Sequence, residues 1–140
     1  MKTQLVKDWM PPNPVCATAH TTLPEALQMM QERRIRRLPV VEQGRLVGIV
    51  TRGDLRGAQP SEATSLSIFE IHYLVGRITL DRLMAKNVLT VTPDTTIGQA
   101  ASLMLKNKIA GLPVTEDGRV VGILTESDIF RLIVRMWEKE

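Results

Sequence analysis

The sequence predicts an α/β fold in which one β-α-β-β-α unit occurs twice along a chain of 140 residues. A shift of 74 residues aligns the chain with itself without a gap from Met10 to Asp54, so that Met10 falls on Met84 and Asp54 on Asp128. Each copy carries a helix start signal at the same place, followed by two short apolar runs joined by a glycine-containing turn. A register held over this length marks an internal repeat.

The first half of each copy is predicted to be a short extended piece followed by a helix. The extended pieces are residues 15–18 and 89–92. The helices start at Thr22 and Thr96, because Thr22 with Glu25 and Thr96 with Gln99 have the spacing of a capping box. Apolar residues then recur at helical spacing in both copies.

The second half of each copy is predicted to be a β-hairpin followed by another helix. The paired apolar runs are residues 38–41 with 46–50 and residues 112–114 with 120–124. Polar turns that end in glycine, residues 42–44 and 116–118, join the runs as in a hairpin. The second helix of each copy begins at Thr51 or Thr125.

The last helix of the chain carries more apolar residues than one face requires. One stripe consists of Ile129, Leu132, Ile133, Met136 and Trp137, and Phe130 and Val134 lie off that stripe. Either the helix is deeply buried, or it presents a face to a second protomer, which is the interpretation we favour.

The repeats predict a first repeat at residues 1–57, a linker at 58–79 and a second repeat at 80–140. Gly57 and Pro60 end the second helix of the first copy early. Ser67 with Glu70 has capping-box spacing and precedes apolar residues at helical spacing, so the linker is expected to contain its own helix.

Composition limits the classes of function. The formal net charge is +3, with 44% hydrophobic and 24% charged residues, which is ordinary for a soluble protein. We expect no membrane span, because no apolar run approaches the required ~20 residues, and no secretory signal. Cys16 is the only cysteine, which excludes an internal disulfide and a multi-cysteine metal cluster. A cytoplasmic location is therefore expected.

Each hairpin ends with the pattern Gly-Ile-x-Thr-x-x-Asp, which contains Thr51 and Asp54 in the first copy and Thr125 and Asp128 in the second. On one interpretation these residues are only helix caps. On the other they bind a ligand, because a helix N-terminus favours phosphate and a carboxylate accepts hydrogen bonds from both hydroxyls of a ribose. The residues alone leave both interpretations open.

The doubled unit, the Leu-Pro-Val strand and the Gly-Ile-x-Thr-x-x-Asp ending resemble the CBS-domain pair, or Bateman module, over about residues 5–137. The linker sequence SLSIFEIHYL at 65–74 is similar to that of stand-alone CBS proteins of the acetoin-utilisation type. The resemblance implies two repeats packed as a pseudo-two-fold pair, a homodimer, and two clefts between the repeats that bind adenosine compounds such as AMP, ADP, ATP or S-adenosylmethionine.

In this family each cleft combines the Thr and Asp of one repeat with a strand of the other, which implies two sets of ligand-binding residues here. The first set is Thr51 and Asp54 for ribose and phosphate, with Asn87, Val88, Ala110, Gly111, Leu112 and Pro113 around the base. The second set is Thr125 and Asp128 with Asn13, Pro14, Arg36, Arg37, Leu38 and Pro39.

The two clefts are expected to differ. The small pair at 110–111 lets an adenine ring approach the backbone, whereas the two arginines at 36–37 either clamp phosphates or block the base. We therefore expect the Asp54 cleft to be the better nucleoside site. The Asp128 cleft is expected to favour more phosphate or to stay empty.

Other candidate sites are weaker. The arginines within residues 33–37 suit the C-terminal end of a helix or a phosphate, and no groove-reading motif supports nucleic acid. His20 and His72 lack a partner at metal-ligand spacing. Cys16 is expected in the core rather than as a nucleophile, and Ser127 next to Asp128 has no matching histidine, so no enzyme activity and no catalytic cofactor are expected.

The predicted function is regulatory. The module is expected to bind an adenosine nucleotide as a regulatory ligand, and an unidentified protein partner is expected to respond to the bound form. The alternative from a different class is a structural or dimerisation module with empty clefts, in which the Thr and Asp residues are caps alone.

Overall fold

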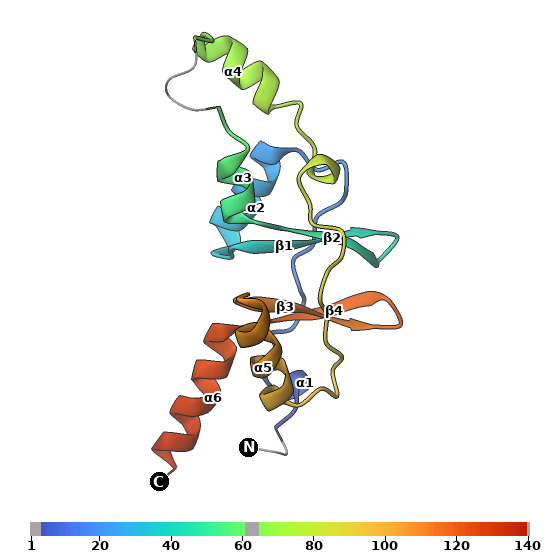
Figure 1. Ribbon diagram of the computed structural model, residues 1–140, viewed down its shortest axis with the longest axis vertical. Helices are drawn as coiled ribbons and strands as arrows, with labels where there is room; N and C mark the ends of the chain where they lie inside the picture. Colours follow the sequence, from blue (N-terminus) through green and yellow to red (C-terminus); the bar gives the residue numbers. More distant parts are fainter. Residues whose placement is uncertain (1–3, 61–64, 140) are drawn as a thin grey trace. The chain divides into compact units, whose positions relative to one another are not determined.

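The computed structural model describes residues 4–60 and 65–139 and divides into two compact units. One unit is Val15–Val88, and the other joins the residues up to Pro14 with those from Leu89 onward. In chain order the elements are α1 (Val6–Trp9), α2 (Leu23–Arg33), β1 (Arg37–Glu42), β2 (Arg45–Thr51), α3 (Arg52–Gly57), α4 (Ile68–Val75), the 3-10 helix η1 (Leu80–Arg82), α5 (Ile97–Asn107), β3 (Gly111–Glu116), β4 (Arg119–Thr125) and α6 (Glu126–Glu138) (Figure 1).

Both predicted hairpins are present, with matching registers. β1 pairs antiparallel with β2, and β3 with β4, and each pair changes register at the equivalent point after the proline of its first strand. Gln43 and Gly44 have φ angles of 52° and 81°, and Asp117 and Gly118 have 54° and 80°. Two consecutive positive φ angles are what a tight two-residue hairpin turn requires, and glycine adopts the second without strain.

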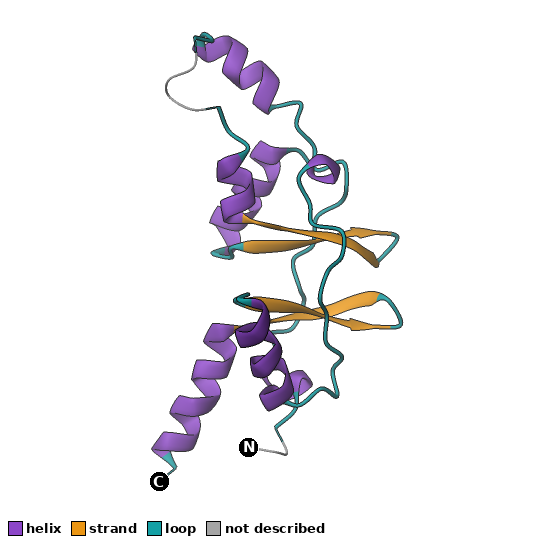
Figure 2. Cartoon of the chain, viewed as in Figure 1, coloured by secondary structure: helices purple, strands orange, loops and turns teal. Residues whose placement is uncertain are grey.

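The predicted capping boxes are also confirmed. The side chain of Thr22 accepts from the amide of Glu25 in α2, and that of Thr96 accepts from the amide of Gln99 in α5. α4 begins at the box of Ser67 and Glu70, within the range expected for the linker helix. Within each unit the helices α2 and α3, or α5 and α6, cover one side of the hairpin (Figure 2).

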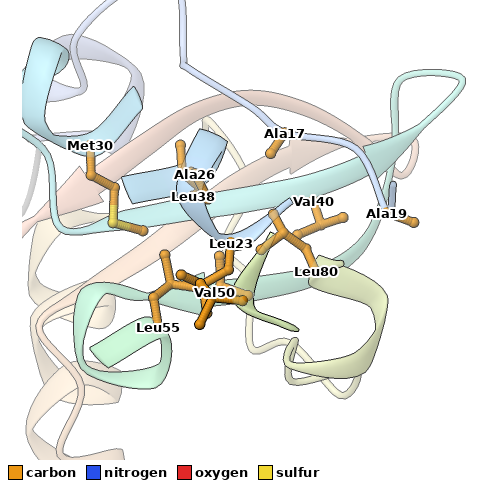
Figure 3. Close-up of a cluster of buried hydrophobic side chains, with 11 residues drawn as sticks. Ala17, Ala19, Leu23, Ala26, Met30, Leu38, Val40, Val50, Leu55 and Leu80 are labelled. Carbon is orange, nitrogen blue, oxygen red and sulfur yellow. The ribbon is translucent and has the colours of Figure 1, made fainter. Parts of the chain in front are cut away.

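Each unit has its own apolar core between its hairpin and its helices. In the unit Val15–Val88, side chains of α2, β1, β2 and α3 meet Leu80 of η1 (Figure 3). Its largest fully buried side chains include Leu23, Leu38, Val40, Val50, Leu55 and Leu80. Because burying one such side chain contributes roughly 1.5–3 kcal/mol, this packing outweighs helix propensity in fixing the short helix α3.

The extended piece that begins each repeat is shorter than the sequence predicts. Ala17 forms a single parallel bridge, in which its amide donates to the Pro39 carbonyl (2.9 Å) and its carbonyl accepts from the Val41 amide (2.8 Å). Val91 makes the equivalent bridge beside Pro113. The next bond of a parallel ladder would need the amide of the proline, which has no N–H.

The compact units cut across the sequence ranges 1–57 and 80–140. The amides of Val6 and Lys7, at the start of the first range, donate to the carbonyls of Thr95 and Pro93 in the second (2.8 and 3.0 Å). The start of the second range packs in the same way on the first, because the Leu80 amide donates to the Thr21 carbonyl (3.0 Å). The first residues of each range, its front segment, therefore pack on the other range.

Of the two interpretations of the last helix, deep burial is wrong for most of α6. Leu132 is 1% exposed, but Phe130 is 59% and Trp137 74% exposed. Ile133 and Val134 are also exposed, at 41% and 50%. α6 thus presents apolar side chains to its surroundings over most of its length.

Candidate ligand-binding site

The first candidate site lies where β2 runs into α3. Thr51 is the last residue of β2 and the N-cap of α3. Its hydroxyl oxygen accepts from the Asp54 amide (3.1 Å), and its own amide donates to Oδ2 of Asp54 (2.9 Å). The side chain of Asp54 is exposed to solvent. The capping role is therefore confirmed, and it still leaves the carboxylate accessible to a ligand.

The second candidate site, at the junction of β4 and α6, has the same residues with different surroundings. The amide and the hydroxyl of Thr125 both donate to Oδ2 of Asp128 (2.8 and 3.2 Å). Nη1 of Arg131 donates to Oδ1 (2.6 Å) in an ion pair one turn along the helix. Asp128 is only 2% exposed. Both oxygens of the second carboxylate are thus already engaged, and the first carboxylate is not buried in this way.

The start of the first strand in each hairpin lies beside the Thr of its own repeat. Arg37 pairs with Thr51, and the Arg52 amide donates to the Arg36 carbonyl (2.7 Å). In the other unit Gly111 pairs with Thr125, and the Glu126 amide donates to the Ala110 carbonyl (3.0 Å). The residues that follow in these strands, Leu38, Pro39, Leu112 and Pro113, are buried.

The two sites differ in the charged residues near them. Arg36 and Arg52 are exposed at the start of α3, and Arg56 is exposed in its last turn. Their counterparts 74 positions later are Ala110, Glu126 and Phe130, which carry one negative charge among them. The first site is therefore surrounded by cationic side chains, which attract anions.

The segments that hold the remaining predicted residues lie close to the hairpins of their units. Ala85 bridges to Ile49 of β2 through two backbone hydrogen bonds (2.9 and 3.0 Å), so the chain leading to Asn87 and Val88 runs beside that strand. Met84 covers Gly48, where a β-carbon would lie 2.5 Å from the methionine sulfur.

Met10 covers Gly122 in the same way in the other unit, on the segment that leads to Asn13 and Pro14. Asn13 has a φ of 56°, in the left-handed region that asparagine tolerates. The combination of one repeat's Thr and Asp with the strand of the other repeat stays a prediction.

Arg131 is the site residue that the sequence analysis missed. Its spacing of three residues from Asp128 on a helix was the available signal. The repeat offered a second signal, since the position equivalent to Arg131 in the first copy is Gly57.

The other candidates give no site of another kind. Across residues 4–60 and 65–139, no group of three or more His, Cys, Asp or Glu residues is placed to hold a metal ion. In the same part of the chain no helix is both long and apolar enough to cross a membrane. Cys16 is half-buried, and its burial raises the pKa of the thiol, which makes it a poor nucleophile.

Comparison with known proteins identifies the family. The CBS domain family matches residues 6–61 and 74–135, so the chain belongs to the CBS domain family and contains a tandem pair. The CBS domain pair of protein MJ0100 in complex with 5′-methylthioadenosine and S-adenosyl-L-methionine is 32% identical, with a TM-score of 0.79 over 96% of this chain and 98% of that one.

Two further solved structures are similar in fold and extent. AcuB from Vibrio cholerae is 31% identical, with a TM-score of 0.80 over 96% of this chain and 93% of that one. CBSX2 in complex with AMP is 28% identical, with a TM-score of 0.79 over 95% of this chain and 98% of that one. The predicted similarity to a CBS protein of the acetoin-utilisation type is thus confirmed.

Some relatives are much longer proteins. L-aspartate semialdehyde sulfurtransferase from Methanocaldococcus jannaschii is 35% identical over 130 residues, which are 91% of this chain and 23% of that protein. The chain spans less than half the length of the first two curated relatives that it matches. What it shares with such an enzyme is the CBS pair.

Proposed function

We propose that the chain is a regulatory module that binds an adenosine-containing compound at Thr51 and Asp54 of the first repeat. The observation that carries the proposal is the exposed carboxylate of Asp54, held at a fixed position by the Thr51 amide. CBS pairs of the same fold occur in complex with AMP, 5′-methylthioadenosine and S-adenosyl-L-methionine. These three ligands share an adenosine-derived nucleoside.

The chemistry of the first site suits the ribose of such a compound. A carboxylate accepts hydrogen bonds from the two neighbouring hydroxyls of a ribose, and each charge-assisted bond is worth roughly 1.5–3 kcal/mol. The hydroxyl of Thr51 accepts from Asp54, so its proton is left for a ligand oxygen. Arg52, the first residue of α3, supplies positive charge for a phosphate at the same place.

The proposed role is regulatory and not catalytic. Binding changes the behaviour of a partner only if the ligand prefers one of two states of the module. The same proposal includes a protein partner that responds to this change and a cytoplasmic location. It also includes contacts to the base from residues such as Asn87 and Val88.

Calorimetric titration with AMP, ADP, ATP, S-adenosylmethionine and 5′-methylthioadenosine tests the proposal. We expect one of these compounds to bind the wild-type chain and to add about 2.7 kcal/mol of stability at a hundredfold excess over its dissociation constant. Asp54→Ala is expected to abolish binding at the first site. Glu25→Ala is the matched control, because it removes the equivalent carboxylate from the capping box of a different helix, α2.

Absence of binding by all five compounds contradicts the proposal. Equal binding by the wild-type protein and the Asp54→Ala variant contradicts the assigned site. Loss of binding in both Asp54→Ala and Glu25→Ala would attribute the effect to a weakened fold.

A second proposed property, association into a homodimer, is favoured by the face between α5 and α6. A groove of about 540 Å³ lies there, lined mainly by apolar side chains such as Met104, Leu105, Ile129 and Phe130. Leu105 is 82% and Phe130 59% exposed. Apolar side chains gathered in this way are typical of surfaces that another molecule covers, and a second copy of the chain presents the same face.

Analytical ultracentrifugation of Phe130→Asp tests this property. We expect the wild-type chain to sediment as a dimer and the variant as a monomer, because a charge cannot be buried in an apolar interface without a partner. Phe69→Asp is the matched control, since Phe69 lies on α4 and is 83% exposed. A dimer that survives Phe130→Asp but not Phe69→Asp would assign the interface to α4 instead.

A further inference from the structure

The two repeats present the same carboxylate in two different states. Asp54 is exposed, and the Thr51 amide donates to its Oδ2. Asp128 is 2% exposed and accepts from Thr125 on Oδ2 and from Arg131 on Oδ1. The difference arises within one helix turn, because Arg131 stands where the first repeat has Gly57.

Resting on the proposed function, we propose that Arg131 is a specificity-determining residue that withholds the Asp128 carboxylate from the ribose of a neutral nucleoside. The ribose hydroxyls must find free acceptor positions, and at Asp128 the guanidinium already holds one oxygen while Thr125 holds the other. A nucleoside without a phosphate therefore binds to the first repeat alone.

The ion pair is well placed for this role. The distance of 2.6 Å between Nη1 of Arg131 and Oδ1 of Asp128 is that of a short, charge-assisted hydrogen bond. The side chain of Arg131 is 66% exposed, so the pair joins a solvent-exposed guanidinium side chain to a buried carboxylate. A neutral ribose offers the guanidinium no charge in exchange for Asp128, whereas a phosphate does.

The hydroxyl groups of the two threonines support the same conclusion. The hydroxyl of Thr125 donates to Asp128, so its proton is already used (3.2 Å). The hydroxyl of Thr51 acts as an acceptor for the Asp54 amide and keeps its proton for a ligand. The second site thus lacks both a free carboxylate oxygen and a free hydroxyl proton for a neutral nucleoside.

The first repeat permits the reverse exchange. A β-carbon built on Gly57 meets no atom within 4 Å, and its backbone φ is not in the left-handed region. Gly57→Arg therefore adds a guanidinium three residues after Asp54, at the spacing of the Arg131 pair, with open space around its β-carbon. The ion pair can thus be removed from the second repeat and introduced into the first.

Calorimetry with 5′-methylthioadenosine, which carries an intact ribose and no phosphate, tests the proposal. We expect one equivalent to bind per wild-type chain and two equivalents per Arg131→Met chain. The affinity of the second site should rise at least tenfold in Arg131→Met, and a tenfold change in affinity corresponds to ~1.4 kcal/mol. Gly57→Arg is expected to weaken the first site at least tenfold, and Gly57→Ala to leave it unchanged. Arg135→Met, one turn further along α6 and over the ring of Trp9, is the control for loss of charge.

The outcomes separate this inference from the proposed function. One equivalent in both wild type and Arg131→Met, with binding lost in Asp54→Ala, overturns the role of Arg131 and leaves the first site standing. Two equivalents in wild type also overturn it. If Arg135→Met binds a second equivalent as Arg131→Met does, the effect comes from the loss of positive charge, and the role of Arg131 is contradicted. Absence of binding in every variant contradicts both the proposed function and the role of Arg131.

Discussion

Replacing each site aspartate by alanine should have unequal effects on stability. In the first repeat Asp54→Ala removes one exposed capping interaction with the Thr51 amide, and such a loss costs about 1 kcal/mol. Asp128→Ala removes bonds from the amide and hydroxyl of Thr125 at a residue that is 2% exposed. Leaving a partly buried amide without an acceptor costs about 1–3 kcal/mol.

The ion pair with Arg131 adds little to this difference. The arginine side chain is 66% exposed and regains water when its partner is removed, so its share is about 0–1 kcal/mol. We therefore expect Asp128→Ala to lower the free energy of unfolding by about 2–3 kcal/mol, against about 1 kcal/mol for Asp54→Ala. Asp128→Asn, which keeps an oxygen for the Thr125 amide, should fall between them.

Urea denaturation at neutral pH with two probes is the suitable assay. Both tryptophans, Trp9 and Trp137, belong to the unit that contains Asp128, so their fluorescence reports that unit, while far-ultraviolet circular dichroism reports the whole chain. Equal losses for the two alanine variants, or a larger loss for Asp54→Ala, would refute the reasoning from burial. A changed denaturant slope would show that the unfolding itself differs.

Two further predictions concern the packing of the unit Val15–Val88. Gly48→Ala should destabilise the chain by about 1–3 kcal/mol, because the new methyl group collides with Met84, and Met84→Ala should recover part of the loss; additive losses in denaturation would contradict this contact. Burial raises the pKa of the Cys16 thiol, so its contribution to stability is complete below the unfolded pKa of about 8.5 and is lost as the pH rises through the folded pKa. The thiol should also react with a disulfide reagent more slowly in the native state than in urea, and equal rates would argue against burial.

Local signals in the sequence were enough to predict most elements of the fold. Capping boxes such as Thr22 with Glu25 act between residues three apart, and hairpin turns such as that at Gln43 and Gly44 act between neighbours. The 74-residue repeat then doubled each signal. At Pro39 the missing N–H of the proline limits the pairing, and the predicted extended piece forms only one bridge.

The parts that could not be predicted depend on contacts between distant residues. The four-residue helix α1 is too short to show periodicity, and its attachment to Thr95 follows from the exchange of front segments. At the site, the sequence predicted Thr125 and Asp128 but not their surroundings. The burial of Asp128 is a tertiary property, and Arg131 looked like any charged residue on a helix.

The exchange of front segments also determines the order in which the two units are completed during synthesis. Val15–Val88 is one continuous stretch, so all of its contacts are available as soon as that stretch has left the ribosome. The residues up to Pro14 are made before that stretch, yet their partners, such as Thr95, are made after it. The unit that carries Asp128 and α6 can therefore be completed only after the unit that carries Asp54 has been made.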